Sequence, residues 1–242
     1  LILAIKILLC TDDTKLSSKF VLRPILIYCE KNDFRMLIKT AYGIINPVKV
    51  NKILEYNKDN ASKKDFDKIQ KEVIDCFTVD ILREINTNID TFFIEGDLSG
   101  FLIDYCSYLI TSKDNSNLQL LFNTLNFYLK YDIENNKEKT ILSHTGHFTL
   151  VNLLKKIFFN HSVENESIKD FINQLSELII ANFSLFINSK GAFIILVLYE
   201  NEYYGEKIRS IVKDKVKDLT KILKENPKSK AIEILVNKLN KK

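Results

Sequence analysis

The chain has 242 residues and a formal net charge of +4, and 46% of its residues are hydrophobic against 27% charged. This balance is typical of a globular protein with a sizeable core, and the length allows one or two compact domains or one elongated array. Six Gly, three Pro and no Trp argue against a β-sandwich or β-barrel, which needs many turn residues. The composition favours helices joined by short connections.

The chain begins with an apolar stretch, LILAIKILLC, which Lys6 interrupts. It has the length of a signal-peptide core, but no small-residue cleavage site follows, and it is too short to span a bilayer. No other apolar run in the sequence approaches membrane length, so we predict no membrane association. Because the sequence has no initiator Met, we expect it to start inside a helix of a longer protein.

Two long segments carry apolar residues at helical spacing, Phe66–Ile85 and Ile208–Glu225. Most of the remaining sequence indicates short helices separated by polar clusters, and no segment alternates as a strand would. Residues 48–64 are rich in Lys and Asn, and we expect them to form a loop. The predicted fold class is therefore all-α.

The cysteines stand far apart among apolar residues and form no CxxC pair. Because apolar surroundings and wide spacing disfavour metal binding and disulfides, we expect buried free thiols in a reducing compartment. The four residues are Cys10, Cys29, Cys76 and Cys106.

A pattern of polar turn, small residue and apolar helix recurs along the chain. It is clearest at Gly191 in NSKGAFIILVLYEN, at Gly146 in SHTGHFTLVNLLKK and at Gly100 in DLSGFLIDYCSYLI, with weaker matches at Leu22 and Lys230. The spacings are 78, 46, 45 and 39 residues, and 78 is two steps of 39. Irregular periods near 40 residues indicate an α-solenoid.

The glycines have a physical reason in such an array. A helix start that packs tightly on the neighbouring repeat leaves no room for a Cβ atom, and a preceding turn can require positive φ. We therefore predict that each glycine marks a repeat junction rather than a phosphate-binding loop.

Five stretches, in their order and approximate spacing, carry a family resemblance across essentially the whole chain. They are CTDDTKL (Cys10–Leu16), SKKDFDKIQKEVIDCFTVDIL (Ser62–Leu82), TGHFTLVNLLKK (Thr145–Lys156), NSKGAFIILVLYEN (Asn188–Asn201) and KSKAIEILVNKL (Lys228–Leu239). Together they resemble the Puf-A branch of the Pumilio-like proteins, including its C-terminal CPL (Penguin-like) region. Leu22 and Lys230 depart from the pattern, because other repeats carry a small residue there.

The resemblance implies a right-handed α-solenoid of Puf/armadillo-like repeats. Residues 1–242 would form a single elongated array, the C-terminal portion of a longer superhelix. The CPL region would span roughly 40–185, and a basic C-terminal repeat region would span 186–242.

The resemblance also implies a function. Puf-A proteins bind RNA and DNA without marked sequence preference, in the nucleus and nucleolus, during large-subunit ribosome biogenesis and rRNA processing. Some relatives repress translation of particular mRNAs. The implied partners are an rRNA precursor or structured RNA, DNA as a further ligand, and pre-ribosomal proteins, and we expect a monomer.

Sequence-reading Pumilio repeats use two or three side chains of the inner helix to contact one base. Counted from the glycine of each repeat, these side chains belong to the first, second and fifth residues after it. Two repeats place there His147, Phe148 and Val151, and Ala192, Phe193 and Leu196. Almost none is a Gln, Glu, Asn or Ser that could read a base edge. Base-by-base recognition by this segment is disfavoured, although repeats upstream of Leu1 could still supply such a code.

The charge is unevenly distributed. Lys207–Lys242 holds twelve Lys and Arg against four Asp and Glu, an excess of +8, so the preceding residues carry −4. This asymmetry indicates a polyanionic partner for the C-terminal part. A solvated, lysine-rich pair of terminal helices is an equally good interpretation.

Phosphate contacts are therefore the predicted mode of binding, with an affinity that falls steeply with salt. Four candidates stand at starts of inner helices, where backbone N–H groups also favour anions: Arg23, Lys190, Lys228 and Lys230. Four more follow helical spacing as one basic stripe: Lys213, Lys217, Lys221 and Lys224. His147 has two interpretations, a ring that stacks on a base or, favoured two to one, a hydrogen-bonding cap of its helix.

The sequence contains no catalytic motif that we recognise, and we predict a protein that is not an enzyme and binds no cofactor. His144 and His147 are three residues apart, but no further ligand lies nearby in sequence, so we predict no metal site. The alternative to nucleic-acid binding is a HEAT- or armadillo-like scaffold for protein–protein interaction.

Overall fold

The structure is a computed structural model that describes residues 78–79, 81–136, 139–161, 165–227 and 229–240. The chain divides into two compact units, Leu1–Thr87 and Asn88–Lys242. In the first unit the described residues, 78–79 and 81–87, are helical. The remaining description concerns the second unit.

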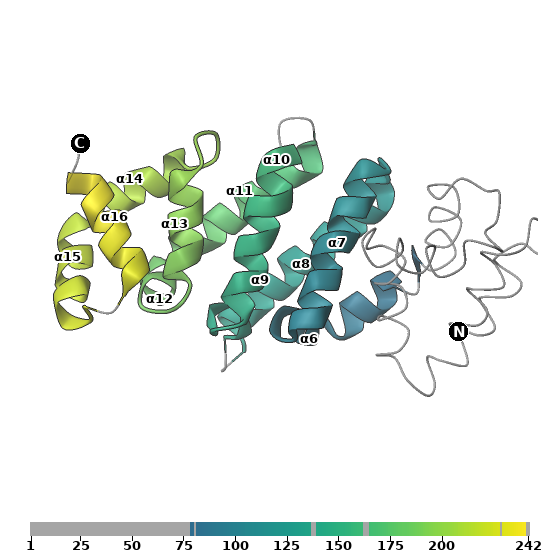
Figure 1. The fold of residues 1–242 in the computed structure, drawn as a ribbon, viewed down its shortest axis with the longest axis horizontal. Helices are drawn as coiled ribbons and strands as arrows, with labels where there is room; N and C mark the ends of the chain where they lie inside the picture. The colour runs from purple at the N-terminus through teal and green to yellow at the C-terminus, as the bar shows by residue number, and fades with distance from the viewer. Residues whose placement is uncertain (1–77, 80, 137–138, 162–164, 228, 241–242) are drawn as a thin grey trace, which may run out of the picture. The chain divides into compact units, whose positions relative to one another are not determined.

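All secondary structure among the described residues is helical, which confirms the predicted all-α class for this part of the chain (Figure 1). The elements are α6 (Ile89–Ile94), α7 (Gly96–Thr111), α8 (Asn115–Glu134), η2 (Thr140–Leu142), α9 (Gly146–Asn152), η3 (Leu153–Phe158), α10 (Phe159–His161), α11 (Glu166–Ala181), α12 (Phe183–Ile187), α13 (Ala192–Glu200), α14 (Glu206–Asp214), α15 (Val216–Glu225) and α16 (Lys230–Asn240).

The helices of the second unit pack in two rows. In one row α9 contacts α6 and α7 on one side and α13 on the other, and α13 contacts α16; Figure 1 shows α7, α9, α13 and α16 following one another in this order. In the other row α8 packs on α11 and α11 on α14. Contacts of α7 with α8, and of α13 with α14, join the rows. We call the α9, α13 and α16 row the front row.

Polar side chains define the starts of several helices. The carboxylate of Asp114 accepts from the backbone N–H of Asn117 at the start of α8, and the amide oxygen of Asn165 accepts from Ile168 at the start of α11. Such caps satisfy N–H groups that have no partner within the first helical turn. They explain why two of the polar clusters in the sequence act as helix boundaries.

An aromatic cluster forms the core where the rows meet. Phe122 of α8, Phe158 of η3 and Phe171 of α11 are fully buried, with ring centroids 5.0–5.4 Å apart. Tilted and edge-on ring pairs at this separation are favourable beyond the area they bury. The hydroxyl of Thr149 in α9 adds a polar link, because it donates to the carbonyl of Phe93 in α6 at 2.9 Å.

The short helix η2 is held by a buried carboxylate. Asp132, at 0% exposure near the end of α8, accepts from the backbone N–H groups of Thr140 and Ile141, both at 2.9 Å, and from the side-chain amide of Asn136 at 2.6 Å. Hydrogen bonds to an ionised acceptor are stronger than neutral ones, and they satisfy a charge that would otherwise be costly to bury. Asp132 therefore fixes the turn between α8 and α9.

Two of the predicted repeat junctions are confirmed as positions with no room for a side chain. A Cβ on Gly146 would lie 2.1 Å from the carbonyl oxygen of Thr140, and a Cβ on Gly191 would lie 2.7 Å from Cδ2 of Leu142 in η2. Neither glycine has positive φ. The requirement is thus close packing rather than an unusual backbone conformation.

The helix starts predicted from the repeat pattern are confirmed at three places and wrong at a fourth. Helix α9 begins at Gly146, Gly191 directly precedes α13, and α16 begins at Lys230. Gly100, in contrast, lies inside α7, which begins at Gly96. The apolar pattern extends N-terminal to Gly100 far enough for the helix to start one turn earlier.

The single helix predicted over Ile208–Glu225 is also wrong. The segment forms α14 and α15, which are separated at Lys215. Helix α14 packs on α11 and α13, whereas α15 packs on α16. One straight helix would not reach both sets of neighbours, so the apolar face is divided between two helices.

Segment η3 is a π-helix that continues directly from α9. Its apolar residues Leu153, Leu154, Ile157 and Phe158 are buried. A π-turn accommodates one more residue than an α-turn, and such turns are frequent at functional sites. Lys155 and Lys156, in the middle of η3, are exposed.

Several predictions lie outside the described residues. They concern the loop at 48–64, most of the helix Phe66–Ile85, the repeat at Leu22 and the side chains Arg23 and Lys228. Of the four cysteines only Cys106 is described; it is a free, fully buried thiol, as predicted, and burial raises its pKa.

A Gly146→Ala substitution should lower the free energy of unfolding by about 2 kcal/mol, because the new methyl group meets backbone rather than a movable side chain. The measurement is urea unfolding of the full chain followed by circular dichroism. Gly96→Ala is the matched control, because a Cβ there has no neighbour within 4 Å. An equal loss in both variants would contradict the packing argument.

An Asp132→Asn substitution keeps the shape of the side chain but places an amide NH₂ where one backbone N–H now donates. We expect a loss of about 2 kcal/mol, since a buried donor remains unsatisfied. Hydrogen exchange should show faster exchange of the Thr140 and Ile141 amides than in the unsubstituted protein. Unchanged protection of both amides would show that the carboxylate does not hold η2.

Candidate nucleic-acid interface

A cleft of about 480 Å³ lies at the N-terminal ends of α13 and α16. Its lining mixes apolar side chains with amide and hydroxyl groups, and none of the described residues that line it is acidic. The lining residues are Leu142, Ile187, Asn188, Ser189, Lys190, Ala192, Phe193, Ile222, Asn226, Ser229 and Ile232. The cleft thus combines four segments that are far apart in sequence, η2, α12–α13, α15 and α16.

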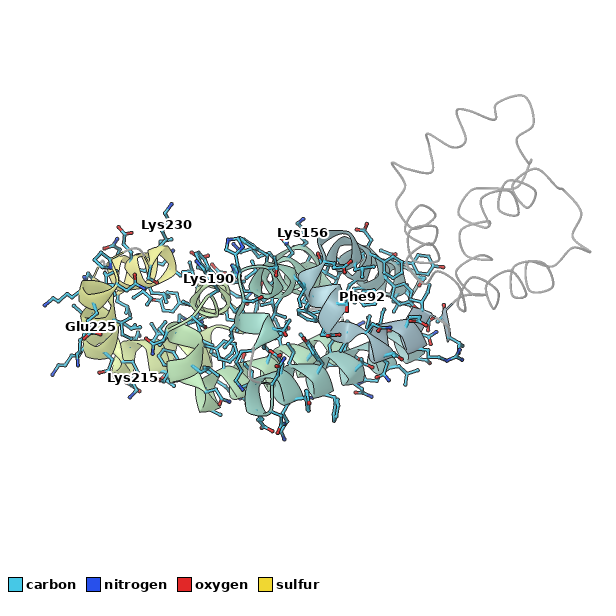
Figure 2. The ribbon with its side chains drawn as sticks, turned by 90° about the horizontal axis from the view of Figure 1, so that it is seen from below. Phe92, Lys156, Lys190, Lys215, Glu225 and Lys230 are labelled. Carbon is cyan, nitrogen blue, oxygen red and sulfur yellow. The ribbon has the colours of Figure 1, made fainter. Side chains whose placement is uncertain are left out.

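Two predicted site residues lie beside this cleft. Lys190 lines it and Lys230 begins α16 next to Ser229; both side chains are exposed. Neither forms an ion pair with a carboxylate in the described part of the chain. Lys156, Lys190 and Lys230 lie along the same edge of the second unit in Figure 2, whereas Lys215 lies along the opposite edge.

Aromatic rings connect the cleft with α9. His147 stacks on Phe193 of α13, with ring centroids 5.5 Å apart and planes at 29°, and lies 4.1 Å from the ring of Phe148. Phe148 is 51% exposed and Phe193 is half-buried. A row of rings next to exposed lysines is the combination that proteins use to bind single-stranded nucleic acid.

His147 is a buried, hydrogen-bonded residue at the start of α9. It is only 2% exposed, and its Nδ1 lies 2.8 Å from the carbonyl oxygen of Ser143, to which it donates. Burial, and to a lesser degree the nearby His144 and Lys190, lower the pKa of His147. The hydrogen bond from Nδ1 does not cap α9, because the hydroxyl of Ser143 accepts from the Gly146 N–H at the start of the helix. It holds the buried ring of His147 against Phe193, so this ring is not exposed for stacking on a base.

The other predicted lysines do not form one stripe. Lys213 lies on α14 and Lys217, Lys221 and Lys224 on α15, on the far side of the break at Lys215. All four are exposed, and Lys221 is 4.0 Å from a carboxylate oxygen of Glu225. The prediction of a continuous stripe is wrong because it assumed one helix. The basic face of α15 alone remains.

Two groups of residues at this site are not predicted from the sequence. One is Lys156 with its neighbour Lys155; the pair is visible in the sequence, and its exposure follows from the position of η3. The other is the far wall of the cleft, formed by Ile222, Asn226 and Ile232. No signal in the sequence joins these residues to Lys190, because only the folding of α15 back onto α16 brings them together.

The described residues contain no group of three or more His, Cys, Asp or Glu side chains placed to hold a metal ion. Over the same residues, none of the helices combines the length and apolar character that crossing a membrane requires.

Comparison with protein-family models, curated proteins and solved structures gives no match. The resemblance to Puf-A proteins therefore stays a prediction that rests on the quoted sequence stretches.

The stability of the fold should fall as the pH drops below about 6.5, the ordinary pKa of histidine. Because the folded state lowers the pKa of His147, the unfolded chain binds a proton there that the folded chain does not. His147→Gln keeps a donor for the Ser143 carbonyl and should reduce this pH dependence. The check is the urea midpoint of both proteins at pH 7.5 and 5.5. An identical fall in both would assign the effect to other groups.

Proposed function

We propose that the chain is a nucleic-acid-binding scaffold that contacts phosphates without strong sequence preference. The observation that supports this proposal best is the edge of the second unit that carries Lys156, Lys190 and Lys230 beside a cleft without acidic lining (Figure 2). Lysines that neutralise phosphates release counterions, which gives affinity independent of sequence. The absence of base-reading side chains at the three positions after Gly146 and Gly191 agrees with this mode.

The architecture we propose is a right-handed α-solenoid of Puf/armadillo-like repeats. The two packed rows, and the tight junctions at Gly146 and Gly191, support stacked repeats in the second unit. Each repeat would cover the apolar face of the next, as in other repeat proteins.

The biological setting follows from the resemblance to Puf-A proteins alone. It comprises large-subunit ribosome biogenesis and rRNA processing in the nucleolus, an rRNA precursor or structured RNA as ligand, DNA as a further ligand, and pre-ribosomal proteins as neighbours. Translational repression of particular mRNAs is a secondary role. We propose a monomer without enzymatic activity.

A protein-interaction scaffold is the second candidate, and one observation favours it. Helix α8 carries three large exposed apolar side chains at helical spacing, Leu120 at 55%, Phe127 at 75% and Tyr131 at 52% exposure. Exposed aromatic residues are enriched at protein interfaces. This stripe lies on α8, whereas the lysines of the proposed interface lie in η3, before α13 and at the start of α16, so the two functions do not exclude each other.

Replacing both Lys190 and Lys230 with Gln should weaken RNA binding about equally for every sequence. Each lost phosphate contact should lower the slope of log affinity against log salt by about 1, so we expect a decrease of about 2. Fluorescence anisotropy with labelled single-stranded RNA of scrambled sequences, at 50–200 mM salt, measures both quantities.

Lys215→Gln is the matched control for each single variant, Lys190→Gln or Lys230→Gln, because it removes one positive charge from the opposite edge of the unit. Its affinity and salt slope should stay close to those of the unsubstituted protein. Equal losses in Lys215→Gln and in either single variant would mean that only net charge matters. If the unsubstituted protein binds no RNA at low salt, the protein-interaction scaffold becomes the better explanation.

A further inference from the structure

We infer that the cleft between α13, α15 and α16 takes one unstacked base of a single-stranded nucleic acid, so that the ligand class is single-stranded rather than duplex. This inference rests on the proposed function and adds to it a subsite for the base. At about 480 Å³ the cleft falls within the range of about 300–1,000 Å³ that is typical of sites for small aromatic ligands.

The walls of the cleft suit the flat faces of a base. Phe193 provides a partly exposed ring and Ile222 partly exposed aliphatic surface, whereas Ile187 and Ile232 line the cleft but are almost fully buried. Because His147 stacks on Phe193, the ring of Phe193 is fixed from one side, and the part that His147 leaves uncovered lines the cleft. A ring that is held in place loses little freedom when a base stacks on it.

The rim suits the polar edge of a base without selecting one base. The side chains of Asn226 and Ser229 line the cleft and form no hydrogen bond among the described residues. The side-chain NH₂ of Asn188 donates to the carbonyl of Ser184 at 2.8 Å, which leaves its amide oxygen as an acceptor. Amide and hydroxyl groups both donate and accept, so any base finds partners. This agrees with binding that has little sequence preference.

Two lysines would hold the phosphate backbone of the nucleic acid at the opening of the cleft. Lys190 lines the cleft, and Lys230 stands next to the lining residue Ser229. A phosphate on either side of an inserted base would therefore lie near a lysine. A base in a duplex is paired and stacked on both sides, and removing it costs a few kcal/mol. The cleft consequently favours a strand whose bases are already free.

The first experiment uses the full chain and no substitution. Anisotropy titrations at constant low salt compare three labelled probes of equal length, an oligouridylate strand, the same strand with abasic sites throughout, and a duplex RNA. Because stacking of one base on an aromatic side chain strengthens binding by a factor of about 5 to 100, we expect the strand with bases to bind at least about fivefold more tightly than the other two probes.

The second experiment fills the cleft. Ser229→Tyr places a ring in the space assigned to the base, and Ser210→Tyr, at an exposed position of α14, is the matched control. We expect Ser229→Tyr to reduce the affinity for oligouridylate to that for the abasic strand, and to leave the affinity for the abasic strand unchanged. Ser210→Tyr should change neither value.

The outcomes separate the inference from the proposed function. If the three probes bind equally and the Lys190 and Lys230 substitutions weaken all of them, phosphate binding stands and the base subsite is wrong. Equal binding of oligouridylate by the unsubstituted protein and a folded Ser229→Tyr variant would also overturn the subsite. If no probe binds at low salt, the proposed function itself is wrong. Since the comparison of strands needs no variant, an unfolded Ser229→Tyr protein would not prevent the test.

Discussion

The buried carboxylate of Asp132 is the interaction on which the described arrangement depends. It receives two backbone N–H groups of η2, and the backbone of η2 then lies so close to α9 that only glycine is accommodated at position 146. The same short helix supplies Leu142, which occupies the space above Gly191 and also lines the cleft. One side chain at the end of α8 therefore determines how α9 and α13 approach each other, and with them the position of Lys190. A charge that is buried and fully hydrogen-bonded has a strong geometric preference, because any shift leaves it unsatisfied.

The parts of the fold that the sequence predicted are those that depend on local patterns. The all-α class follows from helical spacing of apolar residues, and the starts of α9, α13 and α16 follow from a small or polar residue before an apolar run. Asp132 was missed because it stands in a polar cluster with other acidic and amide residues, while its partners lie eight and nine positions further along the chain. The break at Lys215 was missed because the apolar spacing continues across it. The segment divides because α14 packs on α11 and α13, whereas α15 packs on α16.

The basic character of the C-terminal part is distributed over more than one face. Lys190 and Lys230 share an edge with Lys156, but Lys215 projects from the opposite edge (Figure 2). Several other lysines are near carboxylates, such as Lys207 with Glu177 at 3.3 Å, and exposed pairs of this kind contribute little to stability. The excess charge counted along the sequence thus overstates what acts at the cleft. The fold decides which lysines lie near the cleft. Because the chain changes direction at Lys215, the lysines of α14 and α15 do not share one face.

The π-helix η3 has a consequence for comparing repeats with one another. Its wide turn holds one more residue than an α-turn, so the stretch from Gly146 to the core aromatic Phe158 is a residue longer than a regular helix would be. A helical pattern with 3.6 residues per turn therefore shifts by one residue in η3. It would assign the residues that follow η3 to the wrong face of the helix. Gly146 and Gly191 are 45 residues apart, whereas Gly191 and Lys230 are 39 apart. In the repeat register predicted from the sequence, the π-helix accounts for one residue of this difference without a longer loop.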